Sequence, residues 1–97
     1  SAASDVYKRQ KSKDLGIIGI AEIVLALFLQ GQIVGEDGKP VPEVRLARGF
    51  EQLFNLKFGS IYDKVGEVFT RKPYNLTKTL DALRNAIIKE DRKRKSR

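Results

Sequence analysis

The sequence contains no cysteine and no histidine, and these two absences exclude several classes of site. Without cysteine the chain forms no disulfide bond and holds no metal through thiolates. Without histidine it also lacks a common zinc ligand and the most frequent general base. No serine occupies a nucleophile elbow, and no glycine-rich loop follows a strand and opens a helix. The composition therefore predicts a protein that is not an enzyme and uses no metal or cofactor.

The charge of the chain is unevenly distributed. The 97 residues suffice for one small domain, and their formal net charge is +7. The net charge of residues 11–42 is −1 and that of residues 43–97 is +7. Five basic residues lie in the last six positions of the chain. Without that segment, the net charge of residues 43–91 is +2. A basic half of this kind favours a polyanionic partner such as double-stranded DNA. Residues 92–97 are too charged to pack, so we expect a disordered basic tail there.

One long apolar run, LGIIGIAEIVLALFL at residues 15–29, predicts a central core helix that begins after Asp14 and ends at Gly31. The run has 15 residues with Glu22 in its middle, whereas a transmembrane helix needs about 20 apolar residues. A helix that is apolar nearly all round is typical of the centre of a helical core. We expect Glu22 to lie at the helix edge or to pair with a basic residue of a later helix, because no second titratable residue indicates catalysis.

Residues 31–42 contain three glycines and two prolines, which indicates a turn-rich connection with a short strand near residues 32–34. Pro42 suits the first turn of a second helix, at residues 43–54. Gly49 lies inside this helix at a cost of about 1 kcal/mol relative to alanine, so we expect close packing to require it. The apolar face of the helix is predicted to be Leu46, Ala47, Phe50, Leu53 and Phe54.

Two further helices follow. Ser60 and Asp63 resemble a capping box that starts the third helix, which Pro73 ends. The fourth helix is expected to start at Asn75 or Thr77 and to run to about residue 91. Both carry apolar residues at spacings of three and four, which predicts one buried face on each. These faces are Ile61, Val65, Val68 and Phe69 in the third helix, and Leu76, Leu80, Leu83 and Ile87 in the fourth.

The break between the second and third helices is about five residues, close to the three or four of a helix-turn-helix. Gly59 supplies the backbone freedom that a sharp reversal needs. In a DNA-binding unit the start of the third helix would enter the major groove, and the residues after it would contact a phosphate strand. From spacing alone, an ordinary solvated surface explains the same charges slightly better. The candidate DNA-binding residues are Lys57, Ser60, Tyr62, Lys64, Arg71, Lys72 and Lys78.

Three strings of residues occur in order with compatible spacing. They are Ala21-Glu22-Ile23-Val24-Leu25-Ala26-Leu27, then Phe50-Glu51-x-x-Phe54-Asn55-x-x-x-Gly59-x-x-Tyr62, then Arg71-Lys72 followed by Thr77-x-x-Leu80-Asp81-x-Leu83. Together they resemble the C-terminal region of the RteC family, over roughly residues 14–90. The resemblance implies a regulator carried on a conjugative transposon, with a winged-helix-like DNA-binding domain after a helical N-terminal domain. It also implies that the helix with Tyr62 and Lys64 is the recognition helix.

The first ten residues, SAASDVYKRQ, match nothing in the pattern that follows. Residues 5–10 resemble the translated end of a transposase adapter from a sequencing library, so we expect residues 1–10 to be a disordered artefact. We then expect residues 11–91 to form the helical domain, and the protein to continue upstream with an N-terminal domain.

The sequence as a whole predicts a mainly α, four-helix domain with a winged-helix-like helix-turn-helix. The function we predict is a cytoplasmic DNA-binding transcriptional regulator of a mobile element, with double-stranded DNA as its partner and no membrane association. A protein partner or a homodimer would form through the missing N-terminal domain. One alternative is a helical protein–protein interaction module without DNA binding, and another is a peripheral membrane protein anchored by the basic tail.

Overall fold

The computed structural model describes residues 15–96, which form four helices and one short 3-10 turn. The helices are α1 (Ile17–Gln30), α2 (Glu43–Phe54), α3 (Ile61–Phe69) and α4 (Lys78–Lys95), and the turn is Pro73–Asn75. The prediction of a mainly α, four-helix domain is confirmed for this part of the chain. The predicted cap Asp14 and the predicted artefact at residues 1–10 lie outside the described residues.

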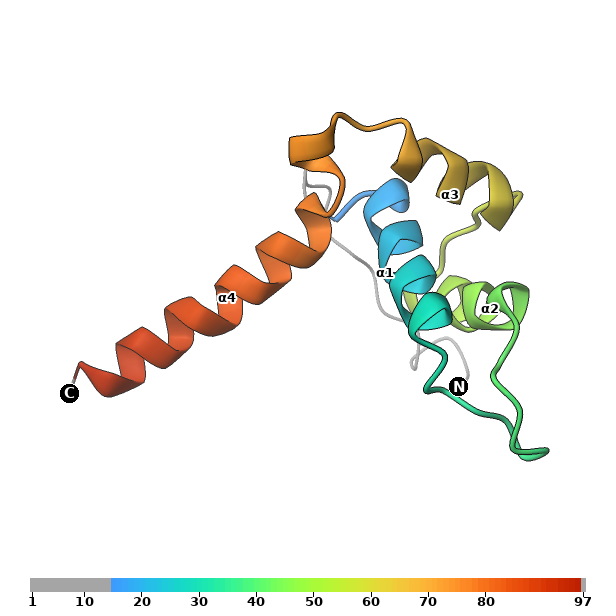
Figure 1. The fold of residues 1–97 in the computed structure, drawn as a ribbon, viewed down its shortest axis with the longest axis horizontal. Coiled ribbons are helices and arrows are strands. Elements are labelled where there is room, and N and C mark those ends of the chain that lie inside the picture. The colour runs from blue at the N-terminus through green and yellow to red at the C-terminus, as the bar shows by residue number, and fades with distance from the viewer. Residues whose placement is uncertain (1–14, 97) are drawn as a thin grey trace.

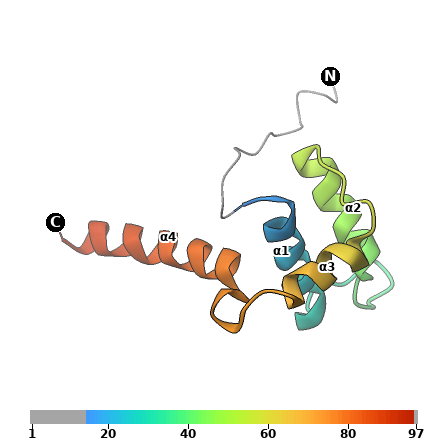
Figure 2. The same cartoon turned by 90° about the horizontal axis from the view of Figure 1, so that it is seen from above.

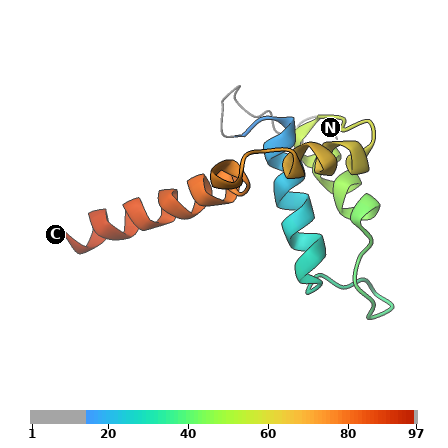
Figure 3. The same cartoon turned by 45° about the horizontal axis from the view of Figure 1, so that its top comes forward.

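Helix α1 is the centre of the fold and packs against α2, α3 and α4 (Figures 1 and 3). Ile20, Ala21 and Val24 are completely buried, as expected for a core helix that is apolar nearly all round. Gly31 ends the helix with a φ of 71°, a left-handed conformation that glycine adopts without strain. No helix among residues 15–96 is long and apolar enough to cross a membrane. The rest of the core comprises Leu25, Ala47, Phe58, Ile61 and Val68.

The connection between α1 and α2 is an exposed excursion without a regular strand. Within residues 15–96 the strand predicted near residues 32–34 is absent, and its place is taken by a single antiparallel bridge between Val34 and Pro40. The bridge is flanked by two backbone hydrogen bonds, from the Gly35 N–H to the Lys39 carbonyl (2.9 Å) and from the Val41 N–H to the Ile33 carbonyl (2.9 Å). At the tip, the Lys39 N–H donates to Asp37 Oδ1 (3.0 Å), which closes the turn.

Helix α2 has the predicted bounds, but one packing expectation in α2 and one in α3 were wrong. In α2, a Cβ atom added at Gly49 would meet no atom within 4 Å, so close packing does not require this glycine. Phe69 of α3 was expected on the buried stripe and is 59% exposed. Ile61, Val65 and Val68 already complete that stripe at spacings of four and three, and Phe69 is rotated by a further 100° or so from Val68.

Helix α4 runs away from the group formed by the other three helices (Figure 2). It continues through Lys95, four residues beyond the predicted end, in the segment predicted as a disordered tail. Ion pairs from Arg94 to Glu90 (2.9 Å) and from Lys95 to Asp91 (3.1 Å) accompany this extension.

The apolar face predicted to be buried on α4 is largely uncovered. Leu83 is 44% exposed and Ile87 is 73% exposed, whereas Thr79 in the first turn is buried. Helical periodicity correctly identified an amphipathic helix, but periodicity does not specify what covers the apolar side. Within the described chain, only the beginning of α4 lies against α1.

Candidate nucleic-acid interface

The turn between α2 and α3 is held by local hydrogen bonds. Asn55 ends α2 in the left-handed conformation, with a φ of 52°. The Glu51 carboxylate then accepts a hydrogen bond from the Phe58 N–H (2.8 Å). Because the Phe58 side chain is also buried in the core, the turn is fixed at both its backbone and its side chain. Gly59, with a φ of 74°, makes the final reversal before α3.

The start of α3 carries the Ser60 half of the predicted capping box. Ser60 is the N-cap, and its hydroxyl oxygen accepts a hydrogen bond from the Asp63 N–H (3.3 Å). Ser60 and the neighbouring Lys57 and Tyr62 are exposed, and Tyr62 retains 64% of its accessible surface. A basic, a hydroxyl and an aromatic side chain are therefore presented together where α3 begins.

The connection between α3 and α4 is fixed by Glu22 of α1. The Glu22 carboxylate accepts hydrogen bonds from the backbone N–H groups of Thr79 (3.1 Å) and Leu80 (2.7 Å), in the first turn of α4. It also pairs with the guanidinium group of Arg71, which donates a second hydrogen bond to the Leu76 carbonyl (3.2 Å). One buried carboxylate thus joins α1, the 70–77 connection and α4.

The electrostatics of Glu22 favour its charged form. Burial by itself would raise its pKa, but the hydrogen bond from the Leu80 N–H, the Arg71 guanidinium and the bonds from Thr79 outweigh burial. The pKa of Glu22 is therefore lowered below its ordinary value. A carboxylate at the first turn of α4 is also stabilised by the positive end of the helix dipole.

Glu22 was expected at the helix edge or paired with a basic residue of a later helix; it does pair with a basic residue, but Arg71 lies in the connection after α3 and not in a helix. Sequence reasoning missed that Glu22 also caps α4. Thr77 is the N-cap residue, as predicted, but its side chain makes no cap hydrogen bond to the helix backbone and donates instead to the Asp81 carboxylate (3.2 Å). The signal in the sequence was a single carboxylate in an aliphatic helix, which indicates a buried partner without identifying it.

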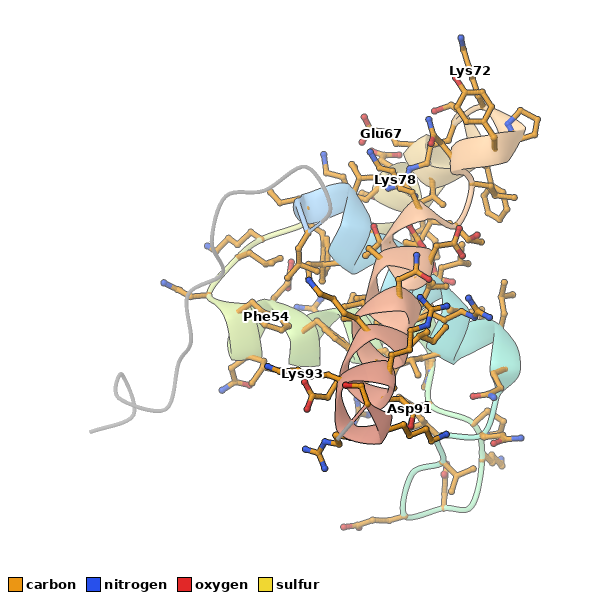
Figure 4. The ribbon with its side chains drawn as sticks, turned by 90° about the vertical axis from the view of Figure 1, so that its left-hand side faces the viewer. Phe54, Glu67, Lys72, Lys78, Asp91 and Lys93 are labelled. Carbon is orange, nitrogen blue, oxygen red and sulfur yellow. The ribbon has the colours of Figure 1, made fainter. Side chains whose placement is uncertain are left out.

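The predicted DNA-binding residues fall into three groups. Lys57, Ser60 and Tyr62 lie together before and within the first turn of α3. Lys72 and Lys78 lie on either side of the 3-10 turn, are exposed, and have no ion pair with a described carboxylate. Figure 4 shows both toward the upper end of the view, with Lys72 projecting away from the body. The third group is engaged elsewhere and comprises Lys64, paired with Glu67 (3.7 Å), and Arg71, whose side chain is 11% exposed.

The residues that carry the RteC resemblance have identifiable structural roles. Glu51, Asn55 and Gly59 build the α2–α3 turn, and Glu22 and Arg71 meet at the start of α4. These residues fix the α2–α3 turn and the connection from α3 to α4. No family model, no curated protein and no solved structure matches the chain. The relationship to the RteC family stays a prediction.

Proposed function

We propose that the chain binds duplex DNA as part of a transcriptional regulator, through the surface around α3. The observation that carries the proposal is the pair Lys72 and Lys78. Both are exposed, both lie next to the α3–α4 connection that Glu22 and Arg71 hold, and neither is paired with a described carboxylate. Lysine ammonium groups in such positions neutralise DNA phosphates and release counterions. The Glu22–Arg71 pair supports the proposal because it holds the connection between the two lysines in one conformation.

In this proposal α2 and α3 act as a helix-turn-helix, with the start of α3 toward the major groove. Tyr62 would face base edges, and so would Lys64 once it exchanges Glu67 for a base, while Lys57, Lys72 and Lys78 would contact phosphates on either side. Arg71 has a structural role in this arrangement. The excursion at residues 33–41 is not assigned as a wing, because its tip carries Glu36 and Asp37, which phosphates would repel. The resemblance to RteC supports transcriptional regulation on a mobile element as the biological setting.

A titration of the full chain with fluorescently labelled duplex DNA, repeated over a series of salt concentrations, tests the proposal. Each lost phosphate contact should reduce the slope of log K against log salt by about 0.9. The Lys72→Ala/Lys78→Ala variant should therefore lose up to about 1.8 of the slope. The matched control is Lys39→Ala/Lys89→Ala, which removes the same charge from exposed positions elsewhere. Equal slopes for both variants would reject this surface as the binding site.

A second candidate function, a helical protein-interaction module, is favoured by one observation. The outer side of α4 leaves Leu83 44% exposed and Ile87 73% exposed, so a protein partner could cover two neighbouring apolar side chains there. In that case the parent protein should show no salt-dependent affinity for duplex DNA, and the lysine variants should behave like the parent.

A further inference from the structure

The exposed side of α4 has the pattern of a helix that pairs with another helix. Leu80, Leu83 and Ile87 follow one another at spacings of three and four, so they lie on one side of the helix. Leu80 is partly covered near α1, and exposure increases along the helix to 73% at Ile87. Figure 1 shows that this part of α4 extends beyond the group of α1, α2 and α3. The apolar stripe therefore lies where a partner can approach it.

A shallow hollow lies beside the end of this stripe, lined by Ala86, Ile87, Glu90, Asp91 and Arg94. Four of these positions, 87, 90, 91 and 94, have the spacing i, i+3, i+4, i+7. Four residues with that spacing surround the hole that accepts one side chain, the knob, from a partner in knobs-into-holes packing. The hollow therefore fits a single apolar side chain projecting from a facing helix.

The stripe itself supplies a matching knob when a second α4 lies antiparallel. If the two-fold axis passes at Ile87, the two Ile87 side chains meet each other. Leu83 lies about 6 Å before Ile87 along the helix, and the centre of the hollow lies about 5 Å after it, from a rise of about 1.5 Å per residue. Along the helix axis, Leu83 of each copy therefore lies within about 1 Å of the hollow of the other. Knob and hole are two parts of one self-complementary surface.

Charge also favours a second copy in the antiparallel direction. In the arrangement above, Arg84 of one copy lies opposite Asp91 of the other, on the same flank of the stripe. A parallel pair would instead bring the two basic segments at residues 92–95 together. Like charges at such positions oppose association.

We propose that two copies of this chain associate through α4 in an antiparallel pair, with Ile87 on the two-fold axis and Leu83 of each copy in the hollow of the other. In this dimer the exposed side of α4 is covered by α4 of the second copy. The dimer does not depend on DNA binding. The interface is small, so the dimer is weak and forms only as the protein concentration rises.

Sedimentation equilibrium of the full chain over a range of concentrations tests the proposal. The parent should change from monomer to dimer as concentration rises, and Ile87→Lys should remain monomeric at every concentration. The matched control is Asn85→Lys, which adds the same charge about 200° away around the helix and should dimerise like the parent. Far-UV circular dichroism establishes that each variant keeps its helices. A parent that stays monomeric or forms larger assemblies, or an Ile87→Lys variant that still dimerises, overturns the proposal.

The absence of native cysteine allows the orientation to be tested by disulfide cross-linking. An Ile87→Cys chain should form a linked dimer under mild oxidation, because the two positions meet on the axis. An Arg94→Cys chain should not, because its two positions lie about 21 Å apart along the antiparallel pair, whereas disulfide formation needs Cα atoms about 5.5 Å apart. Efficient linkage at position 94 would show a parallel pair and overturn the proposed arrangement.

A charge reversal tests the contact between Arg84 and Asp91. Arg84→Glu should weaken the dimer more than Lys89→Glu, which makes the same charge change on the far side of the helix. Equal effects of the two variants would reject the Arg84–Asp91 contact.

Discussion

Replacing Glu22 with alanine should lower the free energy of unfolding by about 3 kcal/mol. The substitution removes the acceptor for the Thr79 and Leu80 N–H groups and leaves Arg71 without its carboxylate. Loss of one member of a buried ion pair costs about 3–5 kcal/mol, and loss of a helix cap costs about 0.5–2 kcal/mol. Arg71 keeps its bond to the Leu76 carbonyl and is 11% exposed, so partial hydration places the total at the lower end of the range.

Urea and thermal unfolding monitored at 222 nm would measure this loss. For a domain of this size, about 3 kcal/mol corresponds to a decrease in Tm of about 12–24 °C. Amide hydrogen exchange should show that Thr79 and Leu80 lose protection before the core of α1 does. The control is Glu67→Ala, which removes an exposed carboxylate paired with Lys64 and should change stability by less than about 0.5 kcal/mol.

A double-variant cycle separates the pair from the individual side chains. Arg71→Ala should also destabilise the fold, because it leaves the Glu22 charge buried with only backbone donors. The double variant should cost at least about 1 kcal/mol less than the sum of the two single variants, because the partners act on each other. The reasoning would be refuted by additive effects, or by a loss of less than about 1 kcal/mol in Glu22→Ala.

Other predictions follow from single positions. The pKa of Glu22 is lowered in the folded state, so its stabilisation is fully present above the unfolded pKa of about 4.3 and is lost as pH falls toward the folded value. Glu22→Gln should accordingly show a smaller loss of stability in acid than the parent, in urea titrations from pH 7 to pH 3 or so. Gly49→Ala and Gly66→Ala should each raise the free energy of unfolding by up to about 1 kcal/mol, since a Cβ atom meets nothing within 4 Å at either position. Gly59→Ala should instead destabilise, because φ is +74° there, and a rise in Tm would contradict the assigned turn. Ser60→Ala should cost about 1 kcal/mol whereas Ser60→Asp should cost little, and equal losses would exclude the capping role.

Local signals in the sequence predicted local structure well. Pro42 and Gly31 indicated where α2 begins and where α1 ends, and Ser60 indicated the cap of α3. Each of these features depends on residues within one turn of the boundary, which a single sequence contains in full. The strand expected at residues 32–34 formed only one bridge, because the segment opposite it within residues 15–96 is the short return of its own turn, at residues 39–41.

Contacts between distant segments could not be read from spacing. Arg71 was expected on the solvated side of the third helix, yet α3 ends at Phe69 and the partner of Arg71 is Glu22, separated from it by 49 positions in the chain. The same limitation applies to α4, whose apolar stripe indicated burial although most of it has no partner within residues 15–96. The candidate site changed accordingly, since Arg71 became part of the scaffold while Lys57, Lys72 and Lys78 stayed exposed.

Chemical-shift mapping tests the proposed DNA-binding surface most directly. A ¹H–¹⁵N spectrum of the full chain would be recorded during titration with a short duplex, at moderate salt to limit nonspecific contacts. The account predicts that the largest shifts occur in two groups, at residues 57–64 and at residues 72–78, with little change at residues 33–41. An absence of shifts, or shifts confined to the basic end of α4 at residues 92–96, would contradict it.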